Sequence, residues 1–261
     1  MAAIALEGRP EHTTEAEHTA RPEQASVQVY ARVAGLMYLL AALLAPFAEF
    51  FVRKGLIVPG DPAATAANVV ASQSLFRAGF ASDLAVFVLE VALAAVLYTL
   101  FRPVHRTLAL VMAFSRLAMA TVLGLNLLNM YTGLQLLTGP AYAAAFEPRQ
   151  LQALAFVFLN AQSDGYKLGM VFFGFHLAVL GYLVARSGFL PRVLGLLMVG
   201  AGLGYLADSF TAFLVPQYAG TLAVVVVVAA LIGELPLLVW LLLKGVHVER
   251  WHQRARAAGS W

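Results

Sequence analysis

The chain has 261 residues, of which 61% are hydrophobic and only 12% are charged. Soluble domains carry about 25% charged residues, so this composition excludes an ordinary soluble globular protein. The net charge of +3 does not indicate a nucleic-acid partner, because basic residues gather in the cytoplasmic loops of membrane proteins. The chain has no cysteine, which excludes disulfides, thiolate metal sites and cysteine nucleophiles.

The two ends of the chain are polar. Residues 1–28 contain five glutamates and two histidines. We predict a disordered cytoplasmic tail there, because a segment of this polar composition cannot bury enough apolar surface to form a core. The segment has no basic region leading into a short apolar core and a cleavage site, so we expect no signal peptide. At the other end, we expect a basic cytoplasmic tail over residues 246–261.

Between these tails, residues 29–245 are predicted to form an all-α domain, a polytopic membrane bundle of six transmembrane helices. Apolar runs of about 20 residues are long enough to cross a bilayer, whereas a β-barrel would show short alternating segments. The expected spans are residues 31–52, 79–101, 106–137, 151–186, 190–214 and 222–244. The third and fourth spans are longer than a bilayer needs, so they either project beyond it or contain a break.

Positive charges predict the orientation of this bundle. Lysines and arginines lie in the second-to-third and fourth-to-fifth connections and in the C-terminal tail, and none lies just before the sixth span. The positive-inside rule then places both termini in the cytoplasm. The long first outer loop is an exception, with Arg53, Lys54 and Arg77. Its later part, Ala63–Phe76, is expected to form a helix along the membrane surface.

Ionisable residues occur inside the predicted spans. Each Lys or Asp at mid-helix costs roughly 2.5–3.5 kcal/mol, so such groups are expected to face protein or water. They are Glu49, Asp83, Glu90, Arg116, Asp164, Lys167, Asp208 and Glu234. Six acids therefore face two bases. The excess predicts carboxylates that are protonated, hydrated, paired with Arg53 or Arg77, or neutralised by a bound cation.

Helical phase groups some of these residues. At about 100° per residue, Asn160, Asp164 and Lys167 fall on one face of the fourth span, whereas His176 points away from it. We expect this face to form one wall of an outward-facing acidic site, level with Asp208. His176 is expected to be a satisfied core histidine.

The second and third spans form a predicted hairpin. Glu90 and Arg116 lie at nearly equal distances from its turn, so we predict that they form a buried ion pair with a structural role. Asn126 and Asn129, on the third span, either line the polar site or form interhelical hydrogen bonds. In the sixth span, Pro236 is expected to kink the helix just after Glu234.

Catalytic and metal-binding signatures are missing from the sequence. It contains no nucleophile elbow, no phosphate-binding loop and no zinc-protease motif, and only one histidine lies in a span. We therefore predict no catalytic residue, no metal site and no cofactor. The predicted ligand- or ion-binding residues are Glu49, Asp83, Asn126, Asn129, Asn160, Asp164, Lys167, Asp208 and Glu234.

Several long motifs carry a resemblance to a known family. They are AEFFVRKGLIVPGDPAATAANVVASQSLFRAGFASDL, LYTLFRPVHRTLALVMAFSRL, LGLNLLNMY, GMVFFGFHLAVLGYLVARSGFLPRVLG and AGLGYLADSF. From Arg32 to about Gly245 the chain resembles the bacterial membrane family called domain of unknown function 4386. The resemblance implies a multi-pass protein of the bacterial inner membrane and carries over no activity. The family more often has an acidic or polar residue where Lys167 stands. Asp208 and Arg116 are therefore stronger candidates than Lys167 for a functional role shared with the family.

Three functional hypotheses remain open. The first is binding or transport of a proton, a cation or a small cationic molecule in the acidic site, and the acid excess favours it. The second is a membrane enzyme acting on a lipid or isoprenoid, with Asp164, Lys167 or His176 in acid–base roles. The third is a non-catalytic sensor or assembly protein in which the ion pairs only fix helix packing. The expected partners are the lipid bilayer and an unidentified small molecule or ion.

Overall fold

The computed structural model describes residues 13–218 and 220–259, with side chains described from residue 27 onward except at residue 223. In this part of the chain all regular elements are helical, and six helical stretches are long and apolar enough to cross a membrane. They are Val27–Leu56, Gln73–Phe101, Arg106–Thr138, Pro148–Ser187, Arg192–Leu214 and Val224–Leu243. The predicted six-helix membrane fold is confirmed.

The first span belongs to α1 (Thr13–Pro46), which continues into a π-helical segment η1 (Phe47–Arg53) and a last turn α2 (Lys54–Leu56). Residues 1–12 of the predicted disordered tail lie outside the described residues. From Thr13 onward the backbone is helical, which differs from the prediction. The Ala, Glu and Gln residues of this stretch are good helix formers, and the apolar part of α1 continues the same helix.

A short helix follows at the far end of α1. The α3 helix (Pro62–Ala71) is capped at its N-terminus by Asp61, whose Oδ1 accepts a hydrogen bond from the Ala64 amide at 2.9 Å. It occupies most of the segment predicted as a surface helix. It ends earlier than predicted because Ser72 leaves the helical conformation, and α4 (Gln73–Phe101) starts at the next residue.

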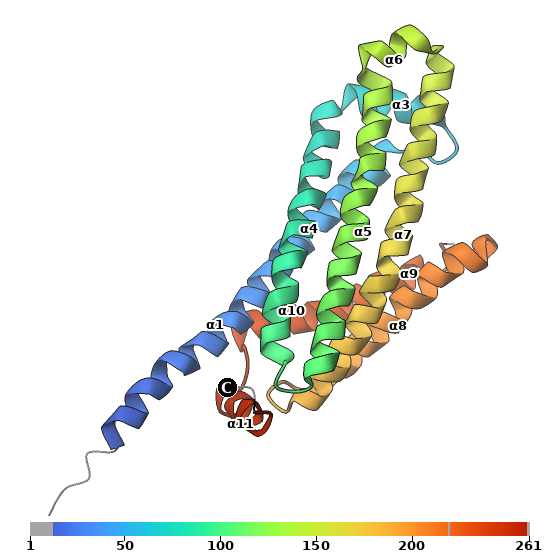
Figure 1. The fold of residues 1–261 in the computed structure, drawn as a ribbon. Helices are drawn as coiled ribbons and strands as arrows, with labels where there is room; N and C mark the ends of the chain where they lie inside the picture. The colour runs from blue at the N-terminus through green and yellow to red at the C-terminus, as the bar shows by residue number, and fades with distance from the viewer. Residues whose placement is uncertain (1–12, 219, 260–261) are drawn as a thin grey trace, which may run out of the picture.

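Two long helices, α5 (Arg106–Thr138) and α7 (Pro148–Ser187), are joined by the short α6 (Pro140–Ala145). At 1.5 Å per residue, they are about 50 and 60 Å long, against about 30 Å of hydrocarbon. Neither is broken, so their extra length projects beyond the rest of the bundle and carries α6 at its tip (Figure 1).

The α8 helix (Arg192–Leu214) packs closely against α7. A Cβ added at Gly202 would lie 2.5 Å from the Gly174 carbonyl oxygen, and one added at Gly195 would lie 2.4 Å from that of Gly181. Glycine is therefore required at these positions for the two backbones to touch.

The sixth span is interrupted. After the 3₁₀ turn η2 (Pro216–Tyr218), it consists of α9 (Ala223–Ala229), a second π-helical segment η3 (Ala230–Glu234) and α10 (Leu235–Leu243). The interruption lies directly before Pro236, where the sequence predicted a kink, because proline has no backbone N–H to continue the hydrogen-bond ladder.

The last helix, α11 (Val248–Ala257), closes one end of the bundle. Trp251 Nε1 donates to the Leu100 carbonyl at 2.8 Å, next to the α4–α5 turn. Arg250 and Arg254 donate to the carbonyls of Gly188 and Arg186, beside the α7–α8 turn. We call this the α11 end, whereas α3 and α6 lie at the opposite, α3 end (Figure 1).

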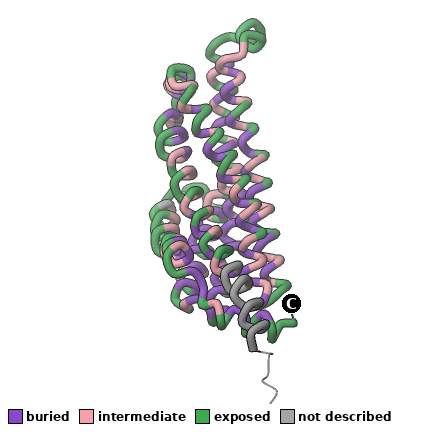
Figure 2. The backbone as a smooth tube through the Cα atoms, turned by 90° about the vertical axis from the view of Figure 1, so that its left-hand side faces the viewer, coloured by how far each residue is buried: buried purple, intermediate pink, exposed green. Residues whose placement is uncertain are grey.

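Burial follows the helical faces. Figure 2 shows buried residues facing the inside of the bundle and exposed ones along its outside. The core holds fully buried leucines such as Leu97, Leu177 and Leu180, whereas large apolar residues such as Val88 and Leu125 are exposed. Since so much apolar surface is costly in water, these outer faces fit the hydrocarbon of a bilayer.

Candidate functional site

A cavity of about 400 Å³ lies inside the bundle. Its walls come from α1, η1, α4, α5, α7, α8, η3 and α10. This volume falls in the range of about 300–1,000 Å³ that is typical of small-molecule sites. Both π-helical segments contribute to the wall, and each presents a carboxylate, Glu49 from η1 and Glu234 from η3. Such segments occur frequently at functional sites.

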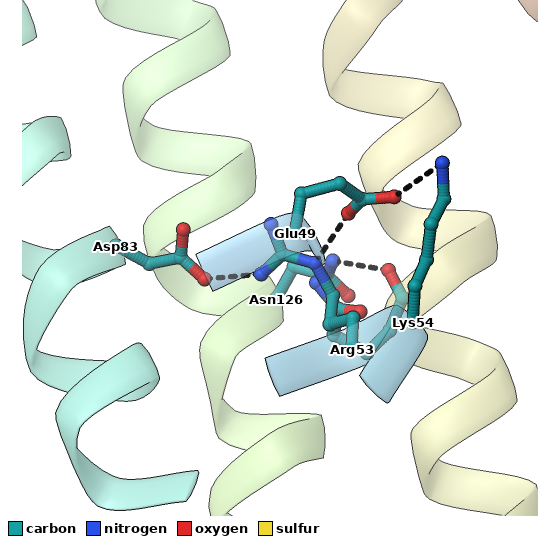
Figure 3. A network of polar contacts seen from close by, with 6 residues as sticks. Glu49, Arg53, Lys54, Asp83 and Asn126 are labelled. Atoms are coloured by element: carbon teal, nitrogen blue, oxygen red, sulfur yellow. Dashed lines mark hydrogen bonds and ion pairs between the residues drawn. The ribbon is translucent and has the colours of Figure 1, made fainter. Parts of the chain in front are cut away.

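Arg53 organises the part of the wall nearest the α3 end. Its Nε donates to Glu49 Oε2 at 2.7 Å, and its Nη1 donates to Asp83 Oδ2. Figure 3 shows the guanidinium group between these two carboxylates. Lys54 adds a looser ion pair, with 3.6 Å from its Nζ to Glu49 Oε1. Arg53 and Asp83 are buried, so this end of the cavity holds paired charges.

Arg116 organises the deeper part of the wall. Its Nε forms an ion pair with Glu90 Oε2, between the two residues predicted to pair from the α4–α5 hairpin. Its Nη1 donates to the Tyr38 hydroxyl at 3.1 Å and lies 2.7 Å from His176 Nε2. This fully buried arginine joins α1, α4, α5 and α7 at one point.

His176 contacts Arg116 and lies outside the cavity lining. Its Nδ1 lies 2.8 Å from the Met112 carbonyl oxygen and its Nε2 faces Arg116. These partners fit a neutral imidazole with the proton on Nδ1, which donates to Met112, while Nε2 accepts from Arg116. His176 is fully buried and does not line the cavity.

Glu234 differs from the other carboxylates of the cavity. It accepts a hydrogen bond from the Tyr205 hydroxyl at 2.8 Å, and among the described residues no lysine or arginine forms an ion pair with it. The cavity thus has four carboxylates, Glu49, Asp83, Glu90 and Glu234, against two guanidinium groups. Glu234 is the one of these four carboxylates that has no ion-pair partner among the described residues.

Aromatic side chains line the cavity together with this carboxylate. Tyr38, Tyr166, Phe173 and Tyr205 all line the cavity. Three of these rings already face cations, since Arg53 lies 5.6 Å from the Tyr166 ring centre, and Arg116 lies 4.9 Å from that of Tyr38 and 5.9 Å from that of Phe173. Aromatic faces attract cations through the ring quadrupole, so the wall is suited to positive charge.

The predicted wall on α7 faces elsewhere. Asn160 and Asp164 are exposed, and Lys167 forms an ion pair with the buried Asp208 of α8. None of these four residues lines the cavity. Asn160, Asp164 and Lys167 follow one face of α7, but that face turns toward α8 and the outside. The face of α7 that lines the cavity carries Tyr166, Met170 and Phe173.

Asn126 and Asn129 also lie outside the cavity wall. Asn126 Nδ2 donates to the Gln162 carbonyl at 2.7 Å, and Asn129 Nδ2 donates to Asn126 Oδ1 at 2.9 Å. The Asn126 contact joins α5 to α7 and so corresponds to the predicted interhelical role, whereas the Asn129 contact lies within α5.

Some residues of the site were not predicted. The sequence suggested Arg53 only as one possible partner for the acids, although it follows Glu49 by four residues, which is an ion-pair spacing on a helix. Tyr38, Tyr166 and Tyr205 were not included, and their signal was a hydroxyl at mid-span that needs a hydrogen-bond partner. The described residues contain no cluster of three or more His, Asp or Glu suited to hold a metal ion.

The relative and the family model that match this chain have descriptions that name no function. An uncharacterised protein of Archaeoglobus fulgidus is 28% identical over 160 residues, which cover 61% of this chain and 79% of that protein. No solved structure matches. A family model matches residues 33–245, which is most of the chain and includes every residue that lines the cavity. The chain therefore belongs to the family described as Domain of unknown function (DUF4386).

Proposed function

We propose that this multi-pass membrane protein binds a small organic cation in the cavity, as a transporter or receptor for such molecules. The observation that carries the proposal is Glu234, a carboxylate without an ion-pair partner among the described residues. It is hydrogen-bonded to Tyr205, whose ring packs edge-on against Phe173 in the same cavity. A desolvated cation beside such rings gains roughly 2 kcal/mol or more from each favourable contact.

The size and lining of the cavity favour an organic cation over the other cations of this hypothesis. A proton needs no cavity of about 400 Å³. Calcium takes six to eight oxygen ligands, and magnesium keeps a shell of waters between carboxylates. Here the lining is largely aliphatic and aromatic, with Glu49 and Asp83 already engaged by Arg53.

The enzyme hypothesis receives less support. It needs Asp164, Lys167 or His176 at a shared reaction site. Asp164 is exposed, Lys167 is paired with Asp208, and His176 is buried behind Arg116. None of the three lines the cavity, so they do not assemble around a substrate there.

Equilibrium binding to the full chain in lipid nanodiscs tests the proposal. The probes are alkyltrimethylammonium ions of increasing chain length, each compared with a neutral alcohol of the same length and with empty nanodiscs. We expect saturable binding of the cations and none of the alcohols. Glu234→Gln keeps the side-chain shape and can still accept from Tyr205, and it should weaken cation binding at least tenfold, or about 1.4 kcal/mol.

Asp164→Asn is the matched control, because it removes a carboxylate of the same membrane domain that lies outside the cavity. It should leave the affinity within twofold of the wild type. Cation binding that is equal in Glu234→Gln and wild type, or that is lost only in Asp164→Asn, would overturn the proposal.

A further inference from the structure

The mouth of the cavity is apolar. Five residues line the cavity and are also exposed on the outside of the protein, namely Ala42, Pro46, Phe50, Leu231 and Leu235. None of them is polar. Phe50 is 54% exposed and Leu231 is 57% exposed, whereas the paired charges Asp83, Glu90 and Arg116 at the back of the cavity are buried.

These residues form two edges. Ala42, Pro46 and Phe50 follow one another at intervals of four on α1 and η1, and Leu231 and Leu235 do so on η3 and α10. The two edges lie on segments of the chain that diverge because they pack against different helices. α1 packs against α10 where Gly35 meets the backbone of Leu242, whereas α9 and η3 pack against α8. Figure 1 shows α1 rising toward α3 while α9 runs beside α8.

The mouth lies at hydrocarbon depth. Ala42 falls at the middle of the span Val27–Leu56, and Leu231 and Leu235 lie on either side of the middle of Val224–Leu243. A mouth open to water would carry polar residues at its rim. The five exposed residues are apolar and lie near the middle of their spans, so this part of the rim faces lipid chains, while the half-buried Glu49 lies beside Phe50.

We infer that the cavity opens sideways into the bilayer and takes an amphiphilic cation, a molecule with an ammonium head and an alkyl tail. This inference rests on the proposed function. The head lies beside Glu234 and the tyrosines, and the tail passes between Phe50 and Leu231 into the lipid. The half-buried Glu49 at the α3 end of the cavity attracts the ammonium head as it enters, while the alkyl tail stays in the hydrocarbon.

A water-soluble cation does not fit this mouth. It would have to cross hydrocarbon without a tail, which is costly for a bare charge. An alkyl chain instead favours the lipid phase with every added methylene group and concentrates the ligand at the mouth.

The chain-length series in nanodiscs tests the inference, together with a bulky residue in the mouth. After subtraction of binding to empty nanodiscs, we expect dodecyltrimethylammonium to bind at least tenfold more tightly than tetramethylammonium. Leu231→Trp should weaken binding of the dodecyl probe at least fivefold. Leu243→Trp is the matched control, because Leu243 is 71% exposed on the same span and lies outside the cavity lining. It should bind as the wild type does.

The outcomes separate the two proposals. If tetramethylammonium and dodecyltrimethylammonium bind equally, Glu234→Gln abolishes both, and Leu231→Trp changes neither, the sideways entry is wrong and cation binding stands. If neither probe binds in a way that depends on Glu234, the proposed function fails and the inference fails with it. Equal weakening by Leu231→Trp and Leu243→Trp would also overturn the sideways entry.

Discussion

At the scale of single residues, buried charge is handled by a few arginines. Arg53 forms ion pairs with two carboxylates. Arg116 forms an ion pair with one carboxylate and hydrogen bonds with a tyrosine and a histidine. A guanidinium group suits this role because it stays charged and offers five donors in a fixed plane. What remains after this pairing is Glu234, and this is why that residue carries the proposed function.

Removal of Arg116 should destabilise the protein more than removal of its whole ion pair. Arg116→Gln leaves Glu90 buried without a partner, which should lower the free energy of unfolding by roughly 3–5 kcal/mol. The double variant Glu90→Gln with Arg116→Gln removes both charges and should recover at least half of that loss. Thermal unfolding in detergent, followed by circular dichroism, measures both.

The double variant also addresses the sensor or assembly hypothesis. If the Glu90–Arg116 pair only fixes packing, as that hypothesis holds, the double variant should keep both the fold and the cellular phenotype of the wild type. A double variant that is no more stable than Arg116→Gln would contradict the assignment of the loss to an unpaired Glu90.

At the scale of elements, the sequence predicted the helices, but for α7 it did not predict which neighbouring helix each face packs against. The phase of α7 correctly placed Asn160, Asp164 and Lys167 on one face, but the side that faces α8 cannot be read from one helix alone. The Glu90–Arg116 pair was easier to predict, because a short turn forces α4 and α5 to lie antiparallel and so sets the depth of both residues.

The contact between α7 and α8 gives a prediction at this scale. Gly202→Ala would place a Cβ 2.5 Å from the Gly174 carbonyl oxygen and 2.7 Å from the Ala178 amide nitrogen. Since these are backbone atoms, the helices must separate, and we expect a loss of about 1–3 kcal/mol in the free energy of unfolding. Unfolding in mixed detergent micelles is the measurement.

Gly200→Ala is the control for that substitution. It lies on the same helix, and an added Cβ there meets no atom within 4 Å. It should leave stability unchanged or raise it slightly, because alanine favours helix more than glycine does. Similar losses in both variants would show that helix propensity, and not the contact with α7, explains the effect.

At the scale of the whole molecule, the basic connections and α11 gather at one end of the bundle. Arg186, Arg250 and Arg254 lie there, beside the α4–α5 and α7–α8 turns. The opposite end carries α3 and the long extensions of α5 and α7 with α6. By the positive-inside rule, we predict that the α11 end faces the cytoplasm.

Single cysteines test this orientation, because the chain has none of its own. Ala144→Cys, on the exposed α6, should react with a membrane-impermeant maleimide on intact cells. Ala258→Cys, just after α11, should react only after the cells are permeabilised. The reverse pattern of labelling would place the α11 end outside and contradict the prediction.

The sequence alone determined that this is a six-span helical membrane protein with charged groups inside it, because span length and hydrophobicity are properties of each segment by itself. It also indicated which acids needed partners. The tertiary structure alone decided that Arg53 and Lys167 supply partners, that Glu234 has no ion-pair partner among the described residues, and that residues of α1 and η3 line one cavity. Those outcomes depend on which faces of separate helices meet, and helical periodicity specifies a face without specifying its neighbour.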